Sequence, residues 1–128
     1  MNFEKTYGTY DLHKLAKWFT HEDGGEFQIA PLNNNKQLEE TMRLTKVNED
    51  VNNKTLYETK ELSCKVLSKA VLIGWKNITD MEGKTLKYSP SAAENVLLNY
   101  NEFTNWVIEQ AKTLVEAKEE EKVEEVKN

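Results

Sequence analysis

LSKAVLIGWKNITDMEGKTLKYSPSAAENVLL, residues 67–98, is the stretch of sequence that decides the fold. It divides into the apolar end of a helix, a polar turn with a short extended segment, and a second helix. Its first part places apolar residues at helical spacing, and Val66 and Ile73 widen the apolar face until little polar surface remains. We therefore expect a helix over about residues 56–75 that is buried toward its C-terminal end.

The polar middle of this stretch predicts a turn followed by a short strand. Residues 77–83 contain the asparagine, aspartate and glycine that favour turns, and residues 85–88 alternate polar with apolar side chains. Ser89 and Pro90 then fit the N-cap and the first position of a helix, because proline has no N–H to lose there and its φ already suits a helix. That helix should cover about residues 90–98.

Upstream of the central helix, two short apolar runs flank a turn with adjacent glycines. This pattern predicts a β-hairpin over about residues 17–30, and Pro31 ends it because proline cannot donate a ladder hydrogen bond. One of the three asparagines that follow should cap a helix over about residues 35–46. The polar segment 46–54 predicts an exposed connection to the central helix.

The last predicted helix, about residues 102–115, has the clearest amphipathic pattern. From Phe103 to Leu114, mostly apolar residues recur at i, i+3, i+4, i+7, i+8 and i+11, so this face should lie against the core. Ile108 and Val115 lie about 100° from the middle of that stripe. They either extend the core, which is the favoured interpretation, or face another chain. On the second interpretation they are the candidate partner-binding residues.

Residues 116–128 are a charged C-terminal extension. Six glutamates against three lysines give −6 + 3 = −3 of the total net charge of −5. Like charges four residues apart weaken a helix, so we expect a fraying helical extension. The rest, residues 1–115, should form a single globular domain. The predicted fold class is mainly α: a small helical domain with a short N-terminal β-hairpin and a charged C-terminal helical tail.

A search for catalytic chemistry finds no motif. Cys64, the only cysteine, lies among apolar residues at helical spacing, which favours a small buried side chain over a reactive thiol. His21 has acidic neighbours, but consecutive residues at a turn rarely converge on one metal ion. Residues 83–85 resemble the end of a P-loop, yet the glycine required five positions earlier is Ile78. We therefore expect no enzyme, no catalytic residue, no cofactor and no metal site.

Charge and hydropathy limit the partners. A net charge of −5 argues against a nucleic-acid backbone or an anionic membrane as the main partner. No apolar run approaches the roughly 20 residues that span a bilayer, and the N-terminal residues lack the apolar segment of a signal peptide. The absence of these two segments predicts a cytosolic protein.

Five short motifs, in this order and spacing, resemble the tail assembly chaperones of long-tailed (siphovirus-type) bacteriophages. The resemblance covers about residues 18–117, in which each motif alone is moderately specific. The motifs are WF at residues 18–19, EFQIAP at residues 26–31, VLIGW at residues 71–75, DMEGK at residues 80–84 and YSP at residues 88–90.

The resemblance implies a non-catalytic role in phage morphogenesis. Proteins of this family bind the long, helical tape measure protein, keep it from aggregating and help to recruit tail tube protein subunits around it. They self-associate, act in the host cytoplasm and are absent from the mature virion. Two alternatives stay open: a structural head-tail junction or tail component of the virion, and a small host-type enzyme or regulatory domain.

Overall fold

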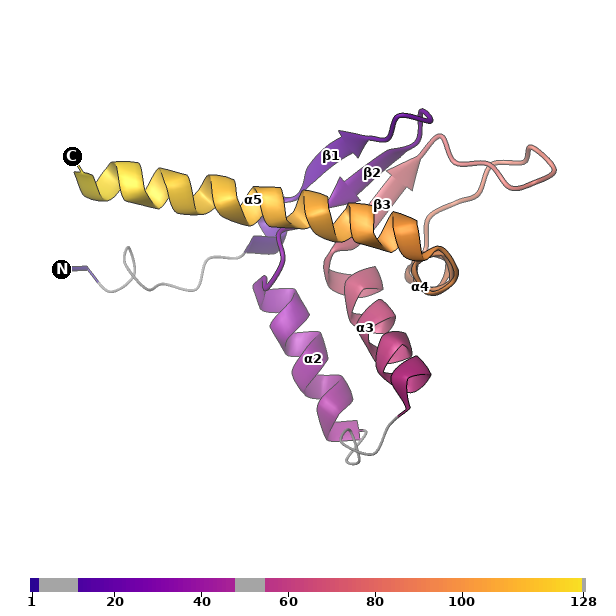
Figure 1. Ribbon diagram of the computed structural model, residues 1–128, viewed down its shortest axis with the longest axis horizontal. Coiled ribbons are helices and arrows are strands. Elements are labelled where there is room, and N and C mark those ends of the chain that lie inside the picture. The colour runs from indigo at the N-terminus through magenta and orange to yellow at the C-terminus, as the bar shows by residue number, and fades with distance from the viewer. Residues whose placement is uncertain (3–11, 48–54, 128) are drawn as a thin grey trace.

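The computed structural model describes residues 1–2, 12–47 and 55–127 (Figure 1). Within these residues the chain forms mainly helices with a small antiparallel sheet, which confirms the mainly-α class. Most of the predicted connection at residues 46–54 lies outside the described residues. In chain order the elements are the 3₁₀ helix η1 (Leu12–Leu15), β1 (Lys17–Thr20), β2 (Glu26–Ile29), α2 (Asn35–Val47), α3 (Leu56–Ala70), β3 (Leu72–Lys76), α4 (Pro90–Asn99) and α5 (Asn101–Lys127).

The sheet has the strand order β1-β2-β3, and both strand pairs are antiparallel. β1 and β2 form the predicted hairpin, whose turn includes Gly24 at a φ of 95°, a conformation that glycine adopts without strain. Phe27 of β2 is opposite Phe19 of β1 and Trp75 of β3. The central strand therefore gathers aromatic side chains from both neighbours.

The prediction of one helix over residues 56–75 is wrong at its C-terminal end. α3 stops at Ala70, and Leu72–Lys76 is the third strand. The backbone leaves the helix at Val71, whose carbonyl accepts a hydrogen bond from the Ala30 N–H at 2.9 Å. A short, continuous apolar run fits a buried strand as well as a buried helix, and pairing with β2 decides between them.

The short strand predicted over residues 85–88 is also wrong. Only an isolated bridge between Thr79 and Thr85 forms in this segment. The bridge consists of two backbone hydrogen bonds, from the Leu86 N–H to the Ile78 carbonyl and from the Asp80 N–H to the Lys84 carbonyl, each 2.8 Å long, while the Leu86 carbonyl accepts from Trp75 Nε1 at 2.8 Å. The segment is thus held against β3 by a side chain instead of by a strand ladder.

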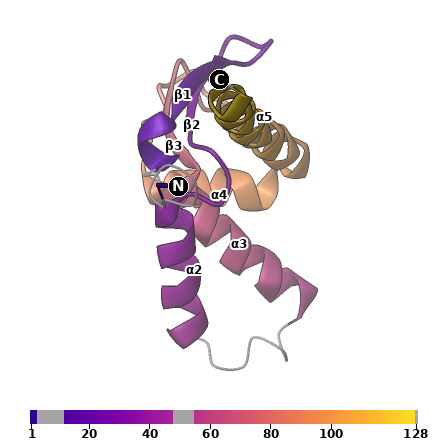
Figure 2. The same ribbon diagram turned by 90° about the vertical axis from the view of Figure 1, so that its left-hand side faces the viewer.

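The helices surround the sheet unevenly. α5 runs across one side of the sheet, while α2 and α3 extend away from the sheet next to each other (Figures 1 and 2). α4 packs against both α3 and α5. The buried core lies where these elements meet and consists of Phe27, Ile29, Cys64, Leu67, Ala70, Val71, Leu72, Trp75, Ala93, Leu97, Val107 and Ala111.

The two last helices begin where the sequence predicts. Ser89 caps α4 by accepting a hydrogen bond from the Ala92 N–H at 3.0 Å, and Pro90 is the first helical residue. α5 begins at Asn101 and continues without a break to Lys127, which confirms that the charged extension is helical. Its C-terminal turns project beyond the rest of the molecule (Figure 1). Among the described residues, no helix combines the length and apolarity needed to cross a bilayer.

Candidate binding groove

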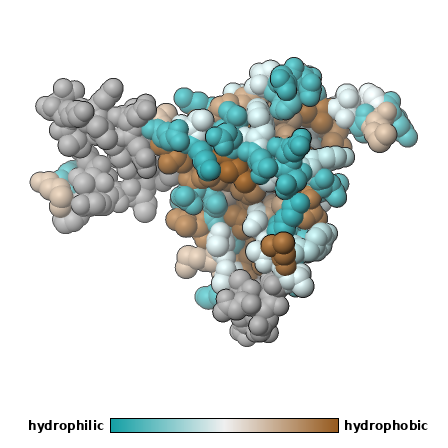
Figure 3. All heavy atoms as spheres, in the orientation of Figure 1, coloured by the Kyte–Doolittle hydropathy of each residue, from teal (hydrophilic) through white to brown (hydrophobic). Residues whose placement is uncertain are grey.

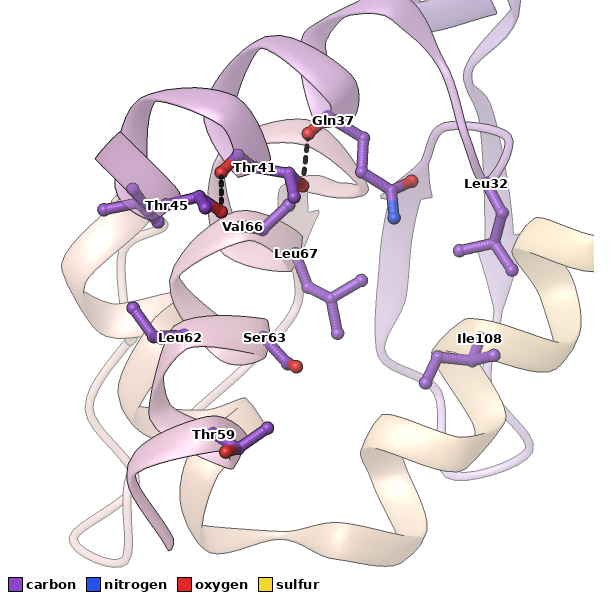
Figure 4. Close-up of a pocket in the computed structure, with 11 residues that line it drawn as sticks. Leu32, Gln37, Thr41, Thr45, Thr59, Leu62, Ser63, Val66, Leu67 and Ile108 are labelled. Atoms are coloured by element: carbon purple, nitrogen blue, oxygen red, sulfur yellow. Dashed lines mark hydrogen bonds between the residues drawn. The ribbon is translucent and has the colours of Figure 1, made fainter. Parts of the chain in front are cut away.

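An open apolar groove lies between α2, α3 and α5 and has a volume of about 400 Å³ (Figure 4). Its surroundings show as brown, apolar surface beneath α5 (Figure 3). Within the part of the chain that the structure describes, no charged residue lines it. Its lining residues are Leu32, Gln37, Thr41, Leu44, Thr45, Thr59, Leu62, Ser63, Val66, Leu67 and Ile108.

Asn34 fixes one end of the groove by joining α2 to α3. Its side chain is fully buried, and its Nδ2 donates to the carbonyls of Pro31 at 2.7 Å and of Ala70 at 2.8 Å. Its Oδ1 accepts from the Gln37 N–H at 2.9 Å and so caps α2. One side chain thus fixes the start of α2 against the end of α3, and every polar atom of the amide has a partner.

A second polar contact supports the same end. Glu40 of α2 is only 7% exposed, and its carboxylate is bonded by Arg43 at 2.8 Å. Lys36 lies 3.4 Å and Lys69 of α3 lies 3.7 Å from the same carboxylate. The ends of α2 and α3 nearest the sheet are therefore tied together, while Figure 2 shows the two helices diverging farther from it. This divergence leaves their facing sides open as the walls of the groove.

The threonines that line the groove contribute little polarity to it. Thr41 donates its hydroxyl to the Gln37 carbonyl at 2.7 Å, and Thr45 donates to the Thr41 carbonyl at 2.7 Å. On the opposite wall, Thr59 donates to the Thr55 carbonyl at 3.1 Å. Each hydroxyl hydrogen is thus used inside its own helix. The groove is more apolar than its sequence suggests.

Exposed apolar side chains continue the groove outward over α2. Leu38 and Met42, four residues apart and therefore on one face of the helix, are 55% and 72% exposed. On α3, Leu56 is 88% exposed near the open end. An apolar surface that extends from a groove onto its rim is typical of a protein contact site.

The structure separates the two predicted partner-binding residues. Ile108 is half-buried and lines the groove. Val115 is also half-buried but lies two turns farther along α5 and is not among the lining residues.

The residues that sequence reasoning missed are those on α2 and α3, because a thin apolar stripe and several threonines gave no sign of a shared surface. The structure points to this surface through the high exposure of Leu38 and Met42, two apolar side chains that lie one turn apart on α2.

The other two residues that were considered from the sequence, His21 and Cys64, lie outside the groove lining. His21 packs edge-on against the Trp106 ring at a centroid distance of 5.0 Å, and its Nδ1 accepts from the Asp23 N–H at 3.2 Å. Cys64 is 1% exposed, and burial raises the pKa of its thiol. Within the described part of the chain, no three His, Cys, Asp or Glu residues lie close enough together to hold a metal ion.

Fold and groove together define a small, mainly helical protein with a helix-lined apolar groove. A family model described as "YdaY prophage protein" matches residues 22–128. This match spans most of the chain, so the protein belongs to the YdaY prophage protein family and is associated with phages. Searches of curated proteins and of solved structures found no match.

Proposed function

We propose that this protein is a tail assembly chaperone that holds an amphipathic helix of the tape measure protein in the groove between α2, α3 and α5. In this role it keeps the tape measure protein soluble and helps to recruit tail tube subunits. The open apolar groove is the observation that carries the proposal. Its walls are helices, its described lining residues carry no charge, and a helix with apolar residues at i, i+3, i+4 and i+7 would fill it.

Two further observations support the proposal. Membership of a prophage family places the protein among phage gene products, where tail assembly is a recurrent task. The motifs at residues 18–90 that resemble tail assembly chaperones lie in and next to the sheet, in the connection between β3 and α4, and at the start of α4, outside the groove itself. Self-association, a site of action in the host cytoplasm, absence from the mature virion and lack of catalysis belong to the same proposal.

The test is coexpression with the tape measure protein encoded beside it, followed by size-exclusion chromatography with light scattering. We expect the tape measure protein to be insoluble alone and to coelute with the wild-type chaperone. Ser63→Glu places a charge in the groove from an exposed position of α3 and should abolish coelution. Ser91→Glu, the same change at an exposed position of α4, is the control and should bind normally.

Three results would overturn the proposal or its binding site. Precipitation of the tape measure protein in the presence of the folded wild-type protein would remove the chaperone role. Detection of this protein in purified virions by mass spectrometry, at the copy number of a tail ring, would favour the structural component instead. Equal coelution of the Ser63→Glu variant would place the binding surface elsewhere on the molecule.

A further inference from the structure

Gln37 places a polar amide inside the otherwise apolar groove. It lies on α2, one turn before Thr41, and its side chain is half-buried. Figure 4 shows its amide nitrogen turned toward the open centre of the groove, across from Ile108. Any helix that fills the groove must therefore meet this group.

The oxygen and the nitrogen of the Gln37 amide differ in their hydrogen-bond partners. Its Oε1 accepts a hydrogen bond from the Asn33 N–H at 2.6 Å. This bond determines which end of the amide is oxygen, because only a carbonyl oxygen can accept from that N–H. The Nε2 keeps its hydrogens and has no partner among the described residues.

Among the described residues that line the groove, no other polar group makes the same demand on a partner. The hydroxyl hydrogens of Thr41, Thr45 and Thr59 are already donated to backbone carbonyls. Ser63 is exposed in the free protein, and when water leaves the groove its hydroxyl can rotate to donate to a backbone carbonyl of its own helix, as the threonines do. A purely apolar helix in the groove would displace water from Gln37 Nε2 and leave a buried donor unpaired, which weakens binding.

We propose that Gln37 is a specificity-determining residue that selects amphipathic helices with one hydrogen-bond acceptor, such as an asparagine, within their apolar face. The acceptor would pair with Nε2 while the flanking apolar residues contact Leu62 and Ile108. This inference rests on the proposed helix binding and adds the chemistry of the helix that is bound. Among helices of equal apolarity, the groove binds most tightly those that carry a hydrogen-bond acceptor at this one position.

The test uses synthetic amphipathic peptides as probes and needs no natural partner. A fluorescein-labelled 18-residue helical parent carries leucine along its apolar face, and each derivative has one of these leucines replaced by asparagine. Binding is measured by fluorescence anisotropy against the wild-type protein, Gln37→Met, Gln28→Met and Ser63→Glu. Methionine keeps the length of the side chain but removes both the Nε2 donor and the Oε1 that accepts from Asn33, so the measured quantity is the ratio of derivative to parent affinity, and Gln28 on β2 lies outside the groove lining.

For the wild-type protein we expect one derivative to bind at least as tightly as the parent, while the other derivatives bind more weakly. In Gln37→Met that same derivative should lose about tenfold in affinity relative to the parent, the effect of one hydrogen bond in a desolvated site. Gln28→Met should behave as wild type.

Three outcomes separate the two proposals. An unchanged ratio of derivative to parent affinity in Gln37→Met would overturn the role of Gln37 and leave helix binding intact. Failure of every peptide to bind the wild-type protein would overturn helix binding in the groove, and the role of Gln37 with it. Undiminished binding of the parent to Ser63→Glu would place the peptides outside the groove and overturn both.

Discussion

Glu40 is the buried charge that the groove-forming helices share. Three cations surround its carboxylate, and each of them is about half exposed: Lys36, Arg43 and Lys69 have side-chain exposures of 42%, 50% and 41%. The hydrogen bond from Arg43 is the main cause that holds the pKa of Glu40 below its ordinary value of 4.5, with Lys69 and Lys36 adding to it and burial opposing it. The carboxylate therefore stabilises the folded state in its charged form.

The sign of the pH dependence follows from this lowered pKa. A carboxyl whose pKa is lower when folded adds stability above its unfolded pKa, and that stability is lost as the pH falls through the folded pKa. At pH 7 we expect Glu40→Gln to lower the free energy of unfolding by about 1–2 kcal/mol, a modest value because the cations remain hydrated. Below pH 4.5, Glu40's ordinary pKa, the difference from wild type should shrink. Urea unfolding at a series of pH values measures it.

Glu39 provides the matched control for this prediction. It is the next residue on α2, its side chain is 71% exposed, and its contact with Lys36 is 4.0 Å long. Glu39→Gln should change the free energy of unfolding by less than about 0.5 kcal/mol at any pH. If the difference in the free energy of unfolding between Glu40→Gln and wild type stays constant from pH 7 to pH 3, the prediction from the lowered pKa of Glu40 is wrong.

At the scale of elements, the boundaries that depend on local chemistry could be predicted from the sequence. Ser89 and Pro90 start α4 because capping and a preset φ act within a few residues. The third strand could not be predicted in this way. Residues 72–76 form a strand because β2, far upstream in the chain, presents an edge to pair with, and an apolar run alone carries no information about that partner.

α5 divides into a packed part and a projecting part. Leu114 is the last buried residue among those α5 side chains that the structure describes, while Glu116 and Ala117 are exposed. Beyond them the helix continues past the body of the molecule (Figure 1). The extension should therefore add helix without adding much to the stability of the domain, because helical stability in proteins comes mainly from tertiary packing.

Truncation tests this division of α5. A chain that ends after Ala117 should keep its free energy of unfolding within about 0.5 kcal/mol of the full chain, while its far-ultraviolet circular dichroism shows the loss of helix. A chain that ends after Ala111 also loses Leu114 and should be destabilised by about 2 kcal/mol or more. Equal destabilisation by both truncations, measured by urea unfolding, would show that the extension packs on the domain.

At the scale of the whole molecule, the groove exists because three separate segments meet. The sequence predicted α2, α3 and α5 and placed Ile108 beside the main apolar stripe, so part of one wall could be found. The other walls could not, because the threonines on α2 and α3 read as polar until their hydroxyl bonds to the backbone are seen. Asn34, which holds α2 against α3, likewise reads as one of three equivalent caps in the sequence.

An open groove that binds a partner leaves apolar surface exposed in the free protein, so filling it should stabilise the fold and weaken binding. Ser63→Leu puts an aliphatic side chain among Leu62, Leu67 and Ile108 and also improves helix propensity on α3. We expect the free energy of unfolding to rise by about 0.5–2 kcal/mol and affinity for the tape measure protein to fall at least about tenfold. Ser91→Leu on α4, an exposed position outside the groove, should leave affinity unchanged. Stabilisation of Ser63→Leu without any loss of binding would mean that the groove stays empty when the partner is bound.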